Sequence, residues 1–173
     1  MGNNARLPRM FAASAVVITA TAALAGTSPS IGRLSGVYKH SFANGNVDGQ
    51  KYRSEDVVEI VKVSDTDAYV RAHLEFFNGH TCAIHGVAKE EGDALVYRPH
   101  QDYGEQCALT LRAANGKLVF SDPSGNCRVQ YCGERGGFEG TAFPLTSRRT
   151  IRYMKVLLNS REYHEALAEA EKR

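Results

Sequence analysis

Tryptophan is absent from the sequence, and so is any apolar run as long as the roughly 20 residues of a membrane-spanning helix. Without tryptophan or interleaved basic and aromatic residues, the chain lacks the stacking platforms of proteins that bind single-stranded nucleic acid. Acidic residues are absent before Asp48, which leaves the first segment purely basic. We therefore predict no nucleic-acid partner, and no membrane span in residues 26–173, which we expect to form the mature chain.

The first 25 residues have the composition of an export signal. Arg6 and Arg9 precede the apolar run MFAASAVVITATAAL at residues 10–24, and the tripeptide Ala-Leu-Ala fits the small-x-small pattern for cleavage before Gly26. No cysteine follows that point and no arginine pair precedes the run, which argues against lipid anchoring and twin-arginine export. We expect residues 1–25 to be removed and the mature protein to be periplasmic or secreted. Retention as a membrane anchor is the alternative.

The charges of the mature chain cancel, but they are unevenly distributed. After removal of Arg6 and Arg9, 19 basic and 19 acidic residues remain, which gives no electrostatic footprint for nucleic acid. Residues 26–147 carry 12 basic and 15 acidic side chains, whereas residues 148–173 carry 7 and 4. A mildly acidic body is therefore followed by a basic segment.

Short runs of β-branched and aromatic residues, separated by turns, fill most of the mature chain. Two Asn-Gly pairs, at Asn78 and Asn115, are strong hairpin signals. About nine short strands are predicted, at 35–42, 54–64, 68–77, 80–88, 94–98, 106–113, 117–121, 126–132 and 138–143. This spacing predicts a mainly β fold, in which an antiparallel meander of about eight or nine strands forms a small barrel over residues 26–147.

The C-terminal residues 148–173 have a helical pattern. Ile151, Met154 and Leu158 would share one face, and Ser160 stands where an N-cap belongs. We predict one broken helix or two short ones, either docked over an edge or opening of the barrel or partly free.

The four cysteines all lie in the mature chain. Their even number in an exported protein predicts two disulfides. We favour Cys82–Cys107, at the same end of nearby strands, and Cys127–Cys132, joined by a turn in the glycine-rich segment. Five residues along a straight strand would put the second pair on opposite faces, so crosswise pairing is the alternative.

Metal and redox sites are the other readings of these cysteines. Cys127 and Cys132 approach the spacing of zinc ligands, and His80 and His85 lie near Cys82. The two histidines, however, would face opposite sides of a strand, and export favours disulfides. A redox pair would need Cys-x-x-Cys at a helix start. We therefore predict no metal and no cofactor.

Catalytic patterns are missing as well. There is no Gly-x-Ser-x-Gly elbow, and no glycine-rich loop precedes a helix. His73 and His85 are predicted to be ordinary strand residues. Four acids that could act as a glycosidase pair are predicted to form a solvated face: Glu55, Asp56, Glu59 and Glu75. We therefore predict a protein that is not an enzyme.

Two resemblances suggest a function. The segment LSGVY, with Gly36 and Tyr38, resembles the start of a lipocalin barrel, which implies a carrier of a small apolar ligand. Residues 35–143, with NGHTCAIHG, CALTL and LVFSDPSGNCRVQYCGERGGFEG, resemble small exported bacterial β-barrels of the lysozyme-inhibitor-like kind. This second resemblance implies a binding protein whose partner is a cell-wall hydrolase. The chain lacks the Ser-Gly-rich loop of the membrane-bound inhibitors, so no inhibitory residue is carried over.

The segment from Ser124 to Gly140 is the predicted contact site. Between its cysteines and glycines it would present Tyr131, Glu134 and Arg135 on a constrained loop. The leading hypothesis is an exported, non-enzymatic binding protein that contacts a protein partner there. A lipocalin-like carrier and a structural envelope protein are the alternatives, and for the loop itself the alternative is a plain staple between strands.

Overall fold

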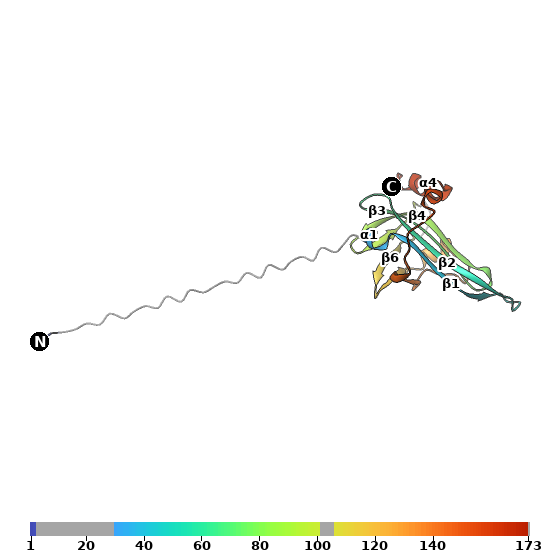
Figure 1. Cartoon of the computed structure of the whole chain (residues 1–173), viewed down its shortest axis with the longest axis horizontal. Helices are drawn as coiled ribbons and strands as arrows, with labels where there is room; N and C mark the ends of the chain where they lie inside the picture. The colour runs from blue at the N-terminus through green and yellow to red at the C-terminus, as the bar shows by residue number, and fades with distance from the viewer. Residues whose placement is uncertain (3–29, 101–105, 173) are drawn as a thin grey trace.

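The computed structural model describes residues 1–2, 30–100 and 106–172, so the predicted export signal lies almost wholly outside the described residues. Eight antiparallel strands follow one another in chain order around a nearly closed barrel (Figure 1), which confirms the predicted meander and fold class. The strands are β1 (Gly36–Gly45), β2 (Lys51–Lys62), β3 (Asp67–Glu75), β4 (Thr81–Glu91), β5 (Ala94–Tyr97), β6 (Leu109–Ala114), β7 (Lys117–Ser121) and β8 (Ala142–Pro144).

The helices are short. The α-helices are α1 (Ser30–Leu34), α2 (Asn126–Tyr131), α3 (Met154–Leu158) and α4 (Arg161–Ala170), and the 3₁₀ turns are η1 (Phe77–Gly79) and η2 (Leu145–Ser147). The predicted strand at residues 126–132 is wrong, because residues 126–131 form α2. Within the described ranges, no helix combines the length and hydropathy needed to cross a membrane.

The barrel closes where the chain after β8 meets β1. The backbone N–H and C=O of Val37 each bond to Arg149, with N···O distances of 2.9 Å. Gly36 makes this approach possible: a Cβ atom there would lie 2.8 Å from the Arg149 carbonyl oxygen, and its φ of +143° disfavours other residues. The glycine of the LSGVY segment is therefore required by the seam of the barrel.

Side chains fill the barrel interior. Alternate residues of each strand point inward, and the largest of them are aromatic rings with at most 2% exposure: Tyr38, Tyr97, Phe120 and Phe143. Gly86 leaves room for one ring, because a Cβ atom there would lie 2.1 Å from Tyr97 Cε2. At one end, Ile31 and Leu34 of α1 join the same core. Each such side chain contributes about 1.5–3 kcal/mol through burial.

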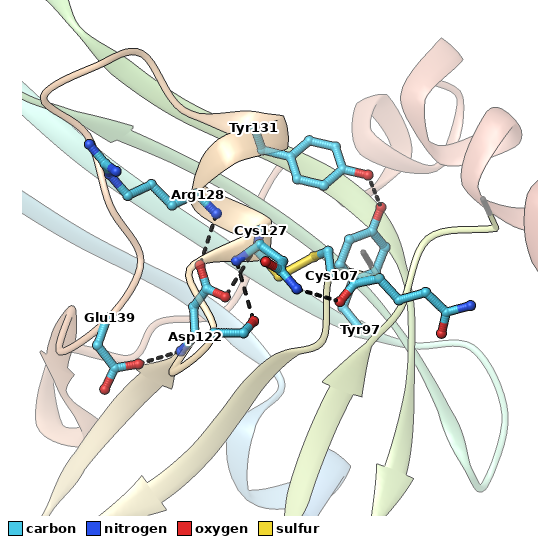
Figure 2. Close-up of a disulfide and its surroundings, with 10 residues drawn as sticks. Tyr97, Cys107, Asp122, Cys127, Arg128, Tyr131 and Glu139 are labelled. Carbon is cyan, nitrogen blue, oxygen red and sulfur yellow. Dashed lines mark hydrogen bonds between the residues drawn. A yellow bond between two sulfur atoms is a disulfide. The ribbon is translucent and has the colours of Figure 1, made fainter. Parts of the chain in front are cut away.

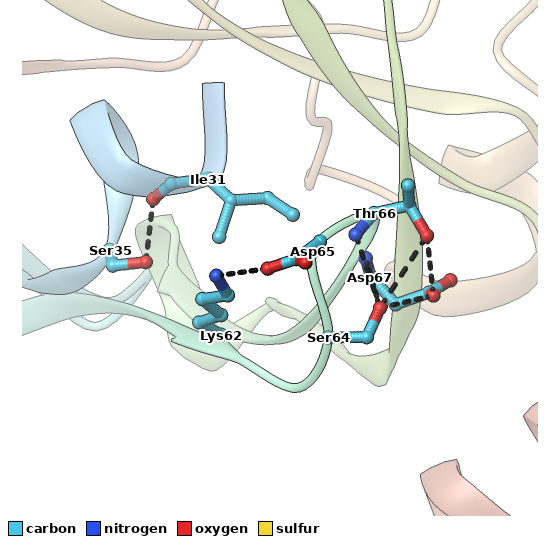
Figure 3. A network of polar contacts seen from close by, with 7 residues as sticks. All are labelled: Ile31, Ser35, Lys62, Ser64, Asp65, Thr66 and Asp67. Carbon is cyan, nitrogen blue, oxygen red and sulfur yellow. Dashed lines mark hydrogen bonds and ion pairs between the residues drawn. The ribbon is translucent and has the colours of Figure 1, made fainter. Parts of the chain in front are cut away.

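The turn between β2 and β3 fixes the register at the end of the barrel that carries α1. Figure 3 shows the Ser64 hydroxyl accepting the backbone N–H of Thr66 (3.1 Å) and of Asp67 (3.0 Å). The same hydroxyl donates to the Asp67 carboxylate at 2.6 Å. Lys62 and Asp65 form an exposed ion pair across the turn. Local side-chain bonds of this kind close a tight turn without glycine.

The C-terminal helices dock on the outer wall of the barrel (Figure 1), as two short helices. The Ser160 hydroxyl accepts the backbone N–H of Tyr163 at 3.2 Å, as predicted for an N-cap. A second apolar cluster joins wall and helices: Val37, Val61, Tyr69, Val87, Ile151, Leu157 and Ala166. Tyr69 meets Tyr163 edge-on, with ring centroids 5.0 Å apart.

Glu59 is buried beneath this segment, at 1% exposure, so its predicted place on a solvated face is wrong. Its carboxylate accepts two bonds from the Arg71 guanidinium and one from the Tyr153 hydroxyl. The hydrogen bond to Glu59 is the main cause that raises the pKa of Arg71. Glu59 therefore fastens the residues before α3 to the barrel wall.

Replacing Glu59→Gln should lower the free energy of unfolding by about 2 kcal/mol. This loss is smaller than the ~3–5 kcal/mol that follows removal of one partner from a fully buried ion pair, because the Arg71 side chain is 32% exposed. Glu55→Gln is the control, since its pair with Lys39 is solvent-exposed and should contribute less than about 1 kcal/mol. Urea denaturation compares the two variants, and equal losses would contradict a special role for Glu59.

The Tyr69 hydroxyl is buried without a hydrogen-bond partner among the described residues. Tyr69→Phe should therefore leave stability at neutral pH unchanged or raise it by up to about 1 kcal/mol. Burial, as the largest cause, raises the pKa of Tyr69 and of Tyr153 to about 12, from an ordinary value of 10.0. Stability contributed by the protonated forms is present below pH 10 and is lost as the pH rises through 12.

Tyr69→Phe should make this alkaline loss smaller. Denaturation at several pH values, with tyrosinate absorbance as a second readout, measures the effect. An unchanged alkaline loss, or destabilisation by more than about 1 kcal/mol at pH 7, would count against this account of the hydroxyl.

Candidate functional site

The predicted contact segment begins as a helix, which the sequence pattern did not indicate. The Asp122 carboxylate accepts the backbone N–H groups of Cys127 (3.3 Å) and Arg128 (2.8 Å), as Figure 2 shows. Asp122 is itself 3% exposed, and its own N–H donates to Glu139. Acceptors of this kind satisfy the free N–H groups of a helix start. Six residues are too few to show a helical period in sequence.

Both disulfides fasten α2 to the barrel, in the crosswise pairing. Cys107 bonds to Cys127 and Cys82 bonds to Cys132, with Cα–Cα distances of 4.5 and 4.0 Å. The favoured pairing of Cys82–Cys107 and Cys127–Cys132 is wrong. Five residues of helix rise about 7.5 Å, which separates the last two cysteines beyond the usual Cα range of a disulfide. The helix is instead held at each end by a different part of the barrel.

The end of α2 occupies a gap in the barrel wall. β5 pairs with β4 only from Ala88 to Glu91, so no strand of the described residues pairs with the first half of β4 on that side. There Cys132 forms a bridge with Cys82, and the Gly133 N–H donates to the Thr81 carbonyl at 2.8 Å. The disulfide segment therefore replaces the missing strand.

Tyr131 lies in this wall. It is half-buried and packs against the core, and its ring meets Tyr97 edge-on with centroids 6.2 Å apart. The two hydroxyl groups are 3.3 Å apart (Figure 2). The structure thus separates Tyr131 from the other two predicted contact residues, and its main role is packing.

Glu134 and Arg135 are exposed, on a loop whose backbone is fixed. The Arg128 side chain donates from Nε to the Gly136 carbonyl (2.8 Å) and from Nη2 to the Glu134 carbonyl (2.6 Å). Gly136 packs on the disulfide, because a Cβ atom there would lie 2.6 Å from Cys82 Sγ. The loop is therefore held by hydrogen bonds on one side and sulfur on the other.

Arg135 reaches across to η1, where its guanidinium carbon lies 5.8 Å from the centre of the Phe77 ring. Phe77 is 43% exposed, which is unusual for so large an apolar side chain. The β1–β2 hairpin contacts η1 as well: Asn78 accepts the Val47 N–H (3.3 Å), and Tyr52 accepts the Gly79 N–H (3.2 Å).

Five partly or fully exposed residues from three segments thus form one surface, called here the Phe77–Arg135 surface: Val47, Tyr52, Phe77, Glu134 and Arg135. Glu134 and Arg135 were predicted from the sequence as contact residues, whereas Val47, Tyr52 and Phe77 were not. The sequence did contain a feature that pointed to Phe77: it is the second of two phenylalanines and directly precedes the Asn-Gly turn.

Two open clefts flank the contact between Arg135 and Phe77. One has a volume of about 440 Å³ and lies on the Arg135 side; its lining is Phe76, Asp122, Gly125, Arg128 and residues 135–141. The other, of about 360 Å³, lies on the Phe77 side along the β1–β2 hairpin. An exposed aromatic ring and an arginine that lie between two clefts have the composition of a protein-binding hot spot.

The described residues show no arrangement suited to binding a metal ion. Among the described residues, no group of three or more His, Cys, Asp or Glu side chains is arranged to hold an ion. All four cysteines are oxidised, so none can supply a thiolate. His73 and His85 lie on the outer wall as half-exposed strand residues beside Glu75 and Glu165.

Removing the disulfides should destabilise the protein to different degrees. The Cys82–Cys132 bond closes 50 residues and the Cys107–Cys127 bond closes 20, so the chain-entropy relation gives about 4 and 3 kcal/mol. Double Cys→Ala variants compared by urea denaturation measure this. Peptide mapping without reductant is the control, and finding Cys127 joined to Cys132 would contradict the structure.

Comparison of the chain with known protein families, curated proteins and solved structures found no match. The resemblance to lysozyme-inhibitor-like proteins is therefore neither supported nor refuted, and it stays a prediction. What this chain does has to be inferred from the Phe77–Arg135 surface and its surroundings.

Proposed function

We propose that this protein is an exported, non-enzymatic binding protein that inhibits a cell-wall hydrolase such as lysozyme, with the Phe77–Arg135 surface as its contact site. The observation that carries the proposal is the exposed Phe77 ring with the Arg135 guanidinium over it. Arg135 lies on the loop that follows α2, and disulfides hold both ends of α2 to the barrel. Aromatic residues and arginine dominate the energetic centres of protein interfaces.

The rigidity of the loop favours binding. A mobile loop loses conformational entropy when it docks, at about 0.5–1.5 kcal/mol for each immobilised side chain. In this chain the bonds from Arg128 and the packing of Gly136 on sulfur have already fixed the backbone. More of the contact energy is then available for affinity.

The charge of Arg135 suits the active site of a glycosidase. Such enzymes hold two carboxylates on either side of the sugar bond that they cleave. A planar guanidinium can pair with a carboxylate through two parallel hydrogen bonds. Phe77 supplies an exposed apolar face beside this cation.

The compartment is consistent with this partner. The two disulfides indicate an oxidising, exported environment. A periplasmic or secreted location, which we propose, is where cell-wall hydrolases act.

The carrier alternative receives less support from the structure. Aromatic side chains occupy the barrel interior, and the two clefts beside Phe77 and Arg135 open on the outside. A lipocalin-like carrier would instead need an apolar hollow inside its barrel.

Purified protein should slow the hydrolysis of peptidoglycan by lysozyme, and Arg135→Glu and Phe77→Ala should each weaken inhibition at least about 10-fold. Arg161→Glu is the matched control, because its side chain lies on α4 and is 82% exposed. Inhibition constants from initial rates provide the measurement. The proposal fails if the protein inhibits none of several lysozymes, or if Arg161→Glu weakens inhibition as much as Arg135→Glu.

A further inference from the structure

β1 has one edge that pairs with β2 and a second edge that is almost unpaired. On the second edge, the N–H and C=O of Val37 bond to Arg149. Backbone groups of a strand point to the same edge at every second residue. The groups of Lys39, Ser41 and Ala43 therefore point to the second edge, where they have no backbone partner among the described residues.

The neighbouring contacts agree with this assignment. The Gly45 N–H, which falls in the same series, is bonded to the Asn44 side chain and not to β2. Lys39, Ser41 and Ala43 are all exposed. The tip of the β1–β2 hairpin also projects beyond the rest of the barrel (Figure 1). An accessible row of unpaired strand groups is a template for pairing with another strand.

This edge is complementary to itself. If two copies pair in antiparallel fashion about a twofold axis at Ser41, Ser41 lies opposite its own counterpart and Lys39 lies opposite Ala43. All three residues then form hydrogen-bonded pairs, which satisfies the six open groups of each copy. The arrangement therefore leaves none of these groups without a partner.

The side chains fit the same register. Lys39 faces a small neutral residue, so no like charges stand directly opposite each other. On the other face, His40 lies opposite Phe42 of the second copy, and aromatic cross-strand pairs are favourable. Within one chain these two rings already stack, with centroids 5.3 Å apart.

We propose that β1 is a dimerisation edge, and that two copies of this protein join their sheets by antiparallel pairing of Lys39, Ser41 and Ala43 across a twofold axis. The partner is a second copy because the spacing of open groups, the charge and the aromatic residues are all self-complementary about Ser41. This proposal does not rest on the proposed inhibition of a hydrolase, although Ala43 also lines the cleft on the Phe77 side of the Phe77–Arg135 surface.

Sedimentation equilibrium of the purified protein should show a concentration-dependent mass that approaches twice that of the monomer. Ser41→Pro removes the N–H on the open edge of each copy but no hydrogen bond to β2. Loss of two hydrogen bonds should weaken dimerisation about 10- to 30-fold. Ser41→Ala keeps the N–H and is the matched control, with circular dichroism to confirm that both variants are folded.

Cross-linking tests the register if Ser41→Pro fails to fold. Ser41→Cys should form a disulfide-linked dimer efficiently, because hydrogen-bonded antiparallel pairs have Cα atoms about 5.5 Å apart. Val156→Cys, at a position 72% exposed on α3, is the control for random collision. A monomer at millimolar concentration, or equal cross-linking of the two cysteine variants, would overturn the proposal.

Discussion

Attachment of α2 at both ends is the constraint on which the candidate site depends. β4 and β5 pair only over their shared end, and the disulfide segment covers the space between them. With Cys127 and Cys132 each bonded to a different part of the barrel, the following loop has a fixed starting point. Arg128, which lies between them, then holds the loop carbonyls. The position of Arg135 over Phe77 follows from this series of contacts.

The strands could be predicted because their signals are local. Alternating burial and Asn-Gly turns are readable within a few residues of β3, β4, β6 and β7. The errors concern features that depend on distant segments. Glu59 has the sequence environment of an exposed strand residue, and Tyr153, far along the chain, contributes to burying it. Likewise, α2 needs Asp122 as its acceptor, and nothing within its six residues shows this.

The structure places the three predicted contact residues in two different settings. Glu134 and Arg135 were predicted from glycines and cysteines, and the structure places both on an exposed, fixed loop. Tyr131 was predicted on the same loop because a Cys127–Cys132 bond would close a corner there, whereas α2 turns its ring toward Tyr97. Phe77 could not be joined to Arg135 from sequence, since the disulfide pairing that brings their segments together was not the favoured one.

The seam between Val37 and Arg149 is expected to form late during folding. Its two sides come from opposite ends of the folded chain, and Gly36 allows them to meet at short range. Contacts this far apart in sequence form late, because a long loop has to close first. During export from the N-terminus, the second edge of β1 would thus stay unpaired at Val37 until the residues around Arg149 emerge. The C-terminal segment both closes the barrel at this seam and covers its outer wall.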